Sequence, residues 1–235
     1  MKKSNTQNKE VLVEKIWGGR SLSRLFNKKL PKGKLIGECW PFYKKDYPIV
    51  VKLLDVKKPL SVQVHPYGKN GKSELWYVVE AGKKSKVLGG INLFEYKAKR
   101  GDWVYLPGGT VHTILPPAVL FEVSQSNLVT YRLYDWGRGK RPLDLENGIK
   151  NIKINSGPKF YRNINYFKCK YFKIKKIKLQ KGKEINQKGI CFVLNGAIKE
   201  KADLINKGEA ALINGKIIAL SNAEIFIINW TVTKQ

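Results

Sequence analysis

The chain is poor in the residues that form disulfides or bind soft metals: among 235 residues there are three cysteines, two histidines and one methionine. Three scattered cysteines without a C-x-x-C pair argue against a disulfide framework and favour a reducing, cytoplasmic location. No run of 18 apolar residues is present, so no membrane span is predicted. Residues 1–10 are basic but no apolar segment follows them, so no secretory signal is predicted.

Acidic residues are also scarce, with 18 Asp and Glu against 45 Lys and Arg and a formal net charge of +27. Such an excess attracts nucleic acid, anionic membranes and anionic substrates alike. The lysines are dispersed, however, and lack regularly spaced aromatic partners. We therefore predict faster capture of an anionic substrate, without a specific nucleic-acid or membrane partner.

Residues 150–183 carry twelve Lys or Arg and no acid. Within this stretch, residues 171–179 (YFKIKKIKL) predict an amphipathic strand pair whose lysines face outward. A basic groove and a solvated sheet face are both compatible with this pattern, and we favour the solvated face.

The pattern of apolar residues predicts an all-β fold with few short helices. Short apolar segments are separated by Gly, Pro and Asn turns at intervals of roughly 8–12 residues, as in sandwiches and barrels. Helices are expected at residues 21–26, with Ser21 as a cap, and at residues 143–152, with Leu145, Ile149 and Ile152 on one face. We predict one domain over residues 1–150 and a smaller β lobe over residues 151–235.

The segment LSVQVHP at residues 60–66 alternates apolar and polar residues, which places Ser61, Gln63 and His65 on one face of a strand. The second histidine, His112, and the carboxylate of Glu74 belong to other strand-like segments. From spacing alone, these residues form either a divalent-metal site or two unrelated imidazoles. Dinucleotide, phosphate-loop and nucleophile-elbow motifs are missing. If both histidines bind metal, a proton must move through a carboxylate, a lysine or metal-bound water.

Several segments occur in an order that closely resembles the type I mannose-6-phosphate isomerases, metal-dependent enzymes of the cupin superfamily. The resemblance is strong from about residue 14 to residue 141. Its segments are 16–19 (IWGG), 37–40 (GECW), 52–55 (KLLD), 60–66 (LSVQVHP), 71–77 (GKSELWY), 101–112 (GDWVYLPGGTVH) and 131–138 (YRLYDWGR). It implies a cupin jelly-roll barrel in the first domain and a degenerate cupin-like lobe after it. Only eight residues separate Trp40 from Ile49, where relatives often carry a longer insertion, so we expect a short form with an open cleft.

The resemblance implies a metal site made by Gln63, His65, Glu74 and His112. It implies one divalent ion per chain, usually zinc. Two oxygens and two imidazole nitrogens suit zinc, although iron, cobalt and manganese accept the same donors.

The resemblance also implies a reaction, the interconversion of mannose 6-phosphate and fructose 6-phosphate through a cis-enediol. Arg132 matches the catalytic arginine, and Ser61 and Lys72 match positions that hold the substrate and its phosphate. The general base stays open between Glu122 and Glu38, with support of the metal ligands as the alternative role for Glu122. A second class of function also stays open: a non-catalytic, regulatory cupin that binds a sugar phosphate. The oligomeric state is not indicated by the sequence.

Overall fold

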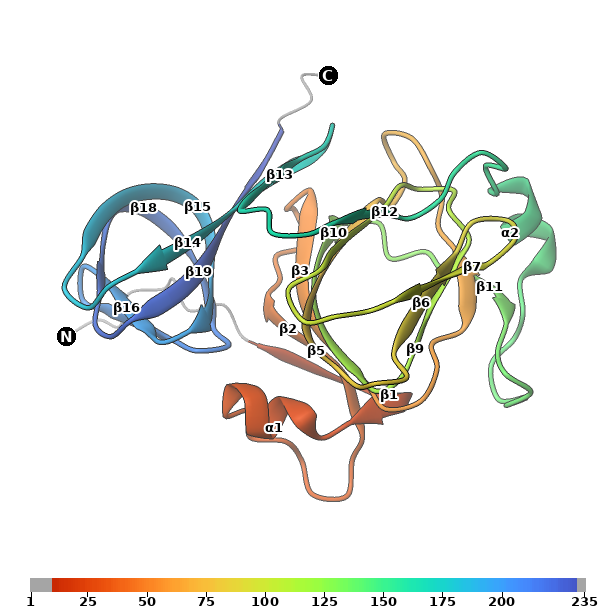
Figure 1. Cartoon of the computed structure of the whole chain (residues 1–235), viewed down its shortest axis with the longest axis horizontal. Helices are drawn as coiled ribbons and strands as arrows, with labels where there is room; N and C mark the ends of the chain where they lie inside the picture. Colours follow the sequence, from red (N-terminus) through yellow and green to blue (C-terminus); the bar gives the residue numbers. More distant parts are fainter. Residues whose placement is uncertain (1–9, 232–235) are drawn as a thin grey trace.

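The computed structural model describes residues 10–231, and it consists of three antiparallel sheets with two short helices. Figure 1 shows a barrel built from the first two sheets, with the curved third sheet beside it. The predicted all-β class is confirmed. Among the described residues, no helix is long and apolar enough to cross a membrane.

Neighbouring strands within each sheet are often far apart in the sequence. In spatial order, the first sheet contains β1 (Val11–Gly19), β2 (Ile36–Phe42), β3 (Ile49–Val56), β10 (Ala118–Gln125), β5 (Glu74–Ala81), β8 (Trp103–Leu106) and β12 (Lys159–Tyr161). The second contains β11 (Tyr131–Tyr134), β4 (Val62–Val64), β9 (His112–Leu115), β6 (Lys86–Gly89) and β7 (Phe94–Lys97). The third contains β13 (Tyr166–Lys168), β14 (Phe172–Leu179), β19 (Ala223–Trp230), β15 (Glu184–Asn195), β18 (Ala210–Ala219), β16 (Ala197–Glu200) and β17 (Asp203–Asn206).

The central strands of the first sheet are buried on both faces, which explains why β3 and β10 are almost continuously apolar. On β10, Phe121 and Val123 belong to the core shared with the third sheet, whereas Leu120 belongs to the core inside the barrel. Because successive side chains alternate between faces, the barrel-facing row also carries Glu122 of β10. The barrel interior is thus where polar side chains of this sheet can form a site.

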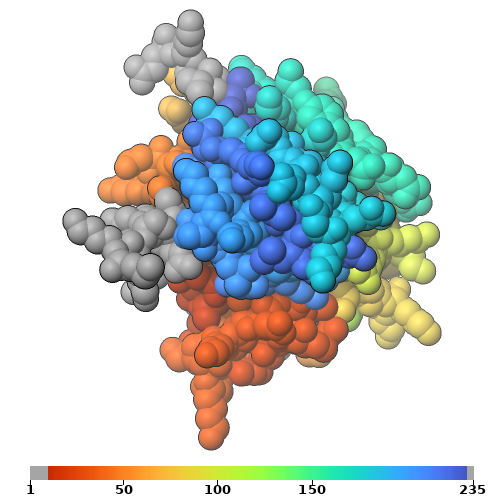
Figure 2. Space-filling view, turned by 90° about the vertical axis from the view of Figure 1, so that its left-hand side faces the viewer, coloured from red at the N-terminus to blue at the C-terminus, as the bar shows by residue number. Residues whose placement is uncertain are grey.

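The third sheet packs on the outer face of the first through an aromatic core. The ring of Phe226 lies between 4.7 and 6.2 Å from the rings of four other aromatic residues, centroid to centroid: Tyr77, Trp103, Phe121 and Phe192. Figure 2 looks onto the third sheet, whose strands (blue) fill the centre of that face. β12 follows the predicted domain boundary at residue 150 but pairs with β8 of the first sheet. The division into domains stays a prediction.

Helix α1 (Ser21–Phe26) forms where expected, but the prediction that Ser21 caps it is wrong. The position before the helix is Arg20, without a side-chain cap, and the amides of Ser21 and Leu22 donate to the Asp55 carboxylate of β3. The helix is therefore capped from the sheet on which it packs.

Helix α2 (Leu145–Lys150) is shorter than the predicted span, and its apolar face is open. Leu145 and Ile149 are 49% and 65% exposed. Ile152, just beyond the end of the helix, is partly buried against Val62, Val64 and Val111. Only this part of the predicted apolar face is covered.

Candidate metal centre

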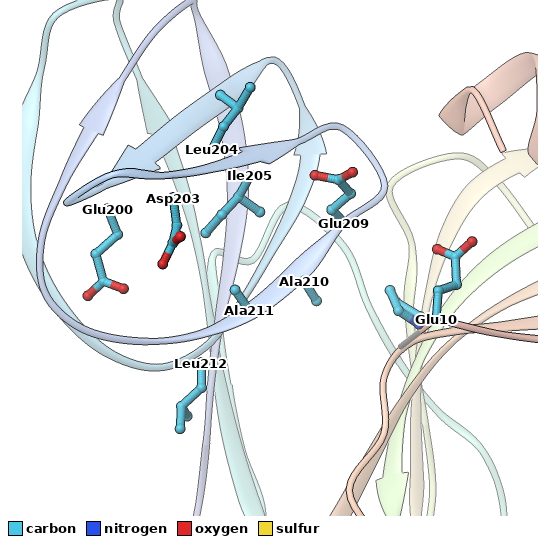
Figure 3. A pocket seen from close by; sticks show the side chains of 10 residues that line it. Glu10, Glu200, Asp203, Leu204, Ile205, Glu209, Ala210, Ala211 and Leu212 are labelled. Atoms are coloured by element: carbon cyan, nitrogen blue, oxygen red, sulfur yellow. The ribbon is translucent and has the colours of Figure 1, made fainter. Parts of the chain in front are cut away.

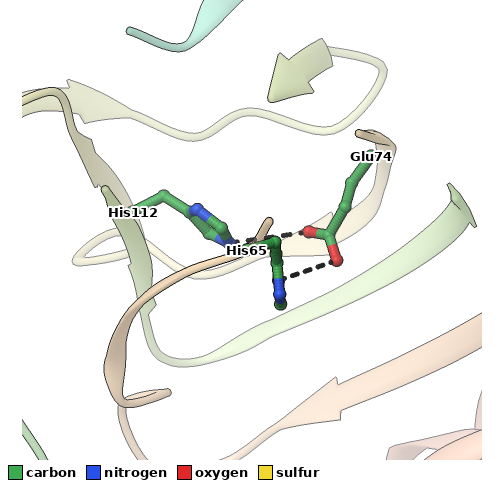
Figure 4. Close-up of side chains that lie close together, drawn as sticks. All are labelled: His65, Glu74 and His112. Carbon is green, nitrogen blue, oxygen red and sulfur yellow. Dashed lines mark ion pairs between the residues drawn. The ribbon is translucent and has the colours of Figure 1, made fainter. Parts of the chain in front are cut away.

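Three metal-ligating side chains meet between the two sheets of the barrel. His65 directly follows β4, His112 begins β9, and Glu74 begins β5 on the opposite sheet. Their ligand atoms all lie within 4.8 Å of one another, and all three side chains are buried. Figure 4 shows the two imidazoles converging on the carboxylate.

Each imidazole is oriented by a backbone carbonyl. His65 Nδ1 lies 2.8 Å from the carbonyl oxygen of Val129, and His112 Nδ1 lies 2.8 Å from that of Thr110. Because a carbonyl only accepts, each Nδ1 carries the proton and each neutral ring keeps a lone pair on Nε2. These Nε2 atoms face Glu74, at 3.2 Å from Oε1 for His65 and 3.6 Å from Oε2 for His112.

The protonation states also suit a metal ion. Burial, assisted by the nearby Lys72 ammonium, lowers the pKa of His65 to about 4, and burial likewise lowers the pKa of His112. Burial alone would raise the pKa of Glu74, but the Lys72 ammonium holds it well below its usual range. At neutral pH the cluster therefore offers two neutral imidazoles and a carboxylate, the forms that bind metals.

Two buried polar atoms of the cluster, His65 Nε2 and Glu74 Oε2, have no hydrogen-bond partner among residues 10–231. Buried polar atoms without partners are uncommon and call for an explanation such as an ion. A divalent cation is bound well by imidazole nitrogen together with carboxylate oxygen. The residues thus fit the ion that the sequence predicts.

The predicted fourth ligand, Gln63, lies beside this cluster. Its Nε2 is 3.3 Å from His112 Nε2, and its Oε1 accepts a hydrogen bond from Ser61 Oγ at 3.2 Å. A half-turn of the amide exchanges its oxygen and nitrogen, so the side chain can present oxygen to an ion. The predicted common face of Ser61, Gln63 and His65 brings all three residues to the site.

A cavity of about 360 Å³ adjoins the cluster. Side chains from both sheets of the barrel line this cavity, and they are far apart in the sequence. The predicted site residues that line it are Glu38, Ser61, Gln63, Lys72, Glu74, Glu122 and Arg132. His65 and His112 are not lining residues, so the cavity meets the cluster at Gln63 and Glu74.

Lys72 lines the cavity with its charge already balanced. Its Nζ lies 2.5 Å from Glu74 Oε1 and 3.8 Å from Glu122 Oε1, and the residue is 5% exposed. Burial alone would lower the pKa of Lys72, but the two carboxylates raise it above the usual range. This ammonium stays charged and is held against the predicted metal ligand Glu74.

Two cavity residues, Lys52 and Lys15, were not predicted from the sequence. Lys52 Nζ lies 3.4 Å from Glu38 Oε2 and 3.7 Å from Glu122 Oε1, and Lys15 Nζ lies 3.1 Å from Glu38 Oε1. A signal for Lys52 was available, because it is the single charge within the apolar run of residues 49–54. Lys15 lies in a mixed segment and gave no such signal.

Arg132 reaches the cavity from the opposite sheet. It lies on β11, where its Cα pairs with that of Gln63 on β4. Its Nη1 donates to the carbonyl oxygen of Pro142 at 2.9 Å, whereas its buried Nε has no partner within the described chain. Burial, followed by the nearby Arg141 guanidinium, lowers the pKa of Arg132.

A second cavity, of about 190 Å³, lies between the N-terminal part of the first sheet and the third sheet (Figure 3). Carboxylates dominate its polar lining: Glu10, Glu200, Asp203 and Glu209. Within the described residues, only His65, Glu74 and His112 form a group of His, Cys, Asp or Glu with metal-binding spacing. The described residues that line this cavity do not include such a group.

Comparison with known proteins finds relatives that are described as mannose-6-phosphate isomerases. The chain is 31% identical over 218 residues to mannose-6-phosphate isomerase ManA of Bacillus subtilis, in a match that covers 64% of this chain and 69% of that relative. Matches to three further relatives, two from Bacillus subtilis and one from Streptococcus mutans, cover 60–67% of their lengths. No model of a protein family matches the chain.

Solved structures show the same fold. The mannose 6-phosphate isomerase of Bacillus subtilis superposes with a TM-score of 0.80 at 22% identity, covering 94% of this chain and 98% of that one. A mannose 6-phosphate isomerase bound with zinc and yttrium superposes with a TM-score of 0.72 at 12% identity, covering 93% and 97%. The order of the sequence motifs, the barrel and the sequence match agree. The chain belongs to the mannose-6-phosphate isomerase family.

Proposed function

We propose that this protein is a metal-dependent aldose–ketose isomerase that interconverts mannose 6-phosphate and fructose 6-phosphate in the cytoplasm. The observation that carries the proposal is the convergence of two neutral imidazoles and a carboxylate, with unpartnered ligand atoms, beside a cavity rich in cations. Gln63, His65, Glu74 and His112 would hold one divalent ion, and zinc is the ion that we propose. When bound, it supplies positive charge for the substrate oxygens next to the reacting carbons.

In this proposal Arg132 provides the other positive charge. Its guanidinium lies on the wall opposite Lys72 and Glu74, and only one of its Nη atoms is used by a backbone carbonyl. A planar cation fixed in advance stabilises the negative charge that develops on the enediolate oxygens more than it stabilises the neutral sugar. Arg132 is then the catalytic arginine that the resemblance implies.

The proton that moves between C2 and C1 needs a base, and the contacts favour Glu122 over Glu38. Both oxygens of Glu38 are engaged, Oε1 by Lys15 and Oε2 by Lys52 and the Trp40 indole. Glu122 receives its contacts on Oε1, and its Oε2 has no hydrogen bond or ion pair among residues 10–231. We assign the base to Glu122, with Oε2 as the oxygen that accepts the proton.

A coupled assay on mannose 6-phosphate tests this function. The purified protein is expected to form fructose 6-phosphate, to lose this activity after treatment with a chelator, and to regain it when zinc is added. Glu122→Gln should lower kcat by about 10²–10⁴, as is typical for loss of a general base. Exposed Glu209, which lines the other cavity, offers a matched control as Glu209→Gln.

The same assay distinguishes the isomerase from the alternative, non-catalytic function. A metal-loaded protein that binds mannose 6-phosphate in calorimetry but forms no fructose 6-phosphate would be a non-catalytic sugar-phosphate cupin, and the enzymatic proposal would be wrong. We keep the anionic sugar phosphate as the expected partner.

A further inference from the structure

Five cationic side chains line the site cavity, and three of them have carboxylate partners on the first sheet. The pairs are Lys15 with Glu38 at 3.1 Å, Lys52 with Glu122 at 3.7 Å, and Lys72 with Glu74 at 2.5 Å, each from Nζ to Oε1. Because the charges of these ammoniums are matched by carboxylates, an incoming dianion gains less from them than from cations that outnumber their carboxylates. The two remaining cations are Arg132, which has no ion pair among residues 10–231, and Arg141, which shares the single carboxylate of Asp135 with Arg138.

Arg132 and Arg141 line the same cavity, and none of the acidic residues that line it forms an ion pair with either of them. No carboxylate within residues 10–231 lies at ion-pair distance from Arg132. The two guanidiniums are close enough for Arg141 to lower the pKa of Arg132, after burial. Two like charges held at one cavity wall are destabilised by each other, and an anion between them removes that cost.

Arg141 is held in a defined orientation from behind. Its Nε donates to Asp135 Oδ2 at 3.1 Å and its Nη2 donates to Asp135 Oδ1, so one edge of the guanidinium forms a bidentate pair. Arg138 also binds Asp135, and its Nη1 donates to the carbonyl oxygen of Pro59, which ties the loop to the barrel. Arg141 Nη1 has no hydrogen-bond partner in the described part of the chain, and the side chain is 21% exposed.

The positions of Arg132 and Arg141 along this wall indicate how the substrate would be oriented in the cavity. Arg132 pairs with Gln63 in strand register, so it lies next to the candidate metal ligands. Arg141 lies on the loop that follows β11 and shares the cavity without belonging to the strand. A six-carbon sugar phosphate with its C1–C2 end at the metal centre would extend its phosphate beyond Arg132, toward Arg141.

We propose that Arg141 is the residue that binds the phosphate of the substrate, through the free Nη1 edge of its guanidinium. This assignment rests on the proposed function and differs from the expectation that Lys72 holds the phosphate. Lys72 balances Glu74 and Glu122, whereas Arg141 is oriented by Asp135 and keeps a donor edge for an oxyanion.

Arg141→Gln tests the assignment, and Lys140→Gln is the matched control. The control substitution removes the same charge from the same loop, but Lys140 is exposed and does not line the cavity. Two quantities are measured: the Kd of inorganic phosphate by calorimetry, which needs no turnover, and the KM for mannose 6-phosphate. Arg141→Gln should raise both by roughly 10- to 100-fold, the range for loss of a hydrogen bond to a charged group, with a smaller change in kcat. Lys140→Gln should leave both close to the parent values.

The results separate this inference from the proposed function. A parent protein that binds inorganic phosphate through Arg141 but never isomerises mannose 6-phosphate would retain the phosphate site and reject the isomerase. A parent that isomerises mannose 6-phosphate while Arg141→Gln keeps the KM and the phosphate Kd would reject the site alone. An equal loss in Lys140→Gln would also reject it, because net charge would then explain the effect. Arg141→Lys, which keeps the charge, gives an intermediate KM and serves if the glutamine variant does not fold.

Discussion

At the scale of single residues, the backbone carbonyls of Val129 and Thr110 decide which nitrogen of each histidine is available for an ion. They accept from Nδ1 and thereby leave Nε2 unprotonated inside the barrel. Glu74 is held beside these atoms by Lys72. The cluster therefore has ligand-competent protonation states before any ion arrives, and it resists protonation.

This resistance gives a pH dependence in the metal-free protein. The pKa of His65 is about 4 in the folded state and about 6.5 in the unfolded chain, so the unfolded chain binds more protons between these values. The contribution to stability is complete above pH 6.5 and is lost as the pH falls toward 4. Urea unfolding of chelator-treated protein should show a loss of about 2 kcal/mol between pH 7 and pH 5 from this group. The window lies above the usual pKa of 4.5 for Glu74, so the imidazoles dominate it.

His65→Gln is the comparison for this pH dependence. The variant should show a smaller drop in unfolding free energy between pH 7 and pH 5 than the parent, because it has one titrating imidazole fewer. Equal drops in the two proteins would show that His65 is not held neutral by burial.

Arg132 is the second residue whose role can be isolated. Arg132→Ala should lower kcat by about 10²–10³, as removal of one fixed donor to a developing oxyanion does, and leave the metal content unchanged. Arg132→Lys should restore little, since an ammonium lacks the planar fork. Exposed Arg100 provides the control variant Arg100→Ala. If Arg132→Ala keeps its kcat and only raises KM, Arg132 binds substrate and is not catalytic.

At the scale of elements, α1 depends on the sheet more than on its own sequence. Its six residues are too few to be stable alone, and its first amides are satisfied by Asp55 of β3. Leu22 and Phe26 are buried in the core shared by the first and third sheets. The helix thus links the barrel to the third sheet.

Asp55→Ala should therefore destabilise the protein by about 1–2 kcal/mol, within the usual range for loss of a capping side chain. Asp144→Ala is the control, because Asp144 precedes α2 without a side-chain cap on its backbone. Thermal or urea unfolding measures both variants. Equal stabilities for Asp55→Ala and the parent would remove the capping role.

The sequence predicted an element well where periodicity and burial agree, as in α1, whose bounds match the predicted residues 21–26 and whose Leu22 and Phe26 are buried. It failed where tertiary contacts decide. Residues 171–179 form the single strand β14 rather than a strand pair, and Lys176 turns inward to donate to the Tyr77 hydroxyl and pair with Glu224. No local pattern reveals that one lysine of this series donates a hydrogen bond to a tyrosine of the first sheet.

For the site residues as well, the sequence predicted what strand geometry decides and missed what tertiary contacts decide. The spacing of Ser61, Gln63 and His65 follows from strand geometry, so their common face could be predicted. The approach of Glu74 from the opposite sheet came only from the resemblance to a family. The pairing of Lys72 with Glu74 and Glu122 depends on three-dimensional distances, which neither the strand pattern nor the family resemblance contains.

At the scale of the whole molecule, the first sheet serves two cores at once. Its inner face closes the barrel around the site, and its outer face packs on the third sheet through Phe226 and its aromatic neighbours. The strands that present Glu74 and Glu122 are therefore braced from behind. We infer that the third sheet contributes to the rigidity of the site without lining its cavity.

Phe226→Ala tests this bracing. Truncation of a fully buried phenylalanine should cost about 3–5 kcal/mol, and unfolding should remain a single transition because both sheets share the core. Leu204→Ala on the third sheet is the control, since Leu204 is 48% exposed. Two separate transitions in the parent protein would show that the sheets fold independently.

The claim on which the rest depends is that His65, Glu74 and His112 hold one divalent ion. The number of divalent ions per chain, measured by elemental analysis of protein purified without added metal, tests it most directly. We expect close to one ion per chain in the parent and a large loss in His112→Ala, with retention in Arg132→Ala, because Arg132 is not a ligand. Equal metal content in the parent and His112→Ala would contradict the account.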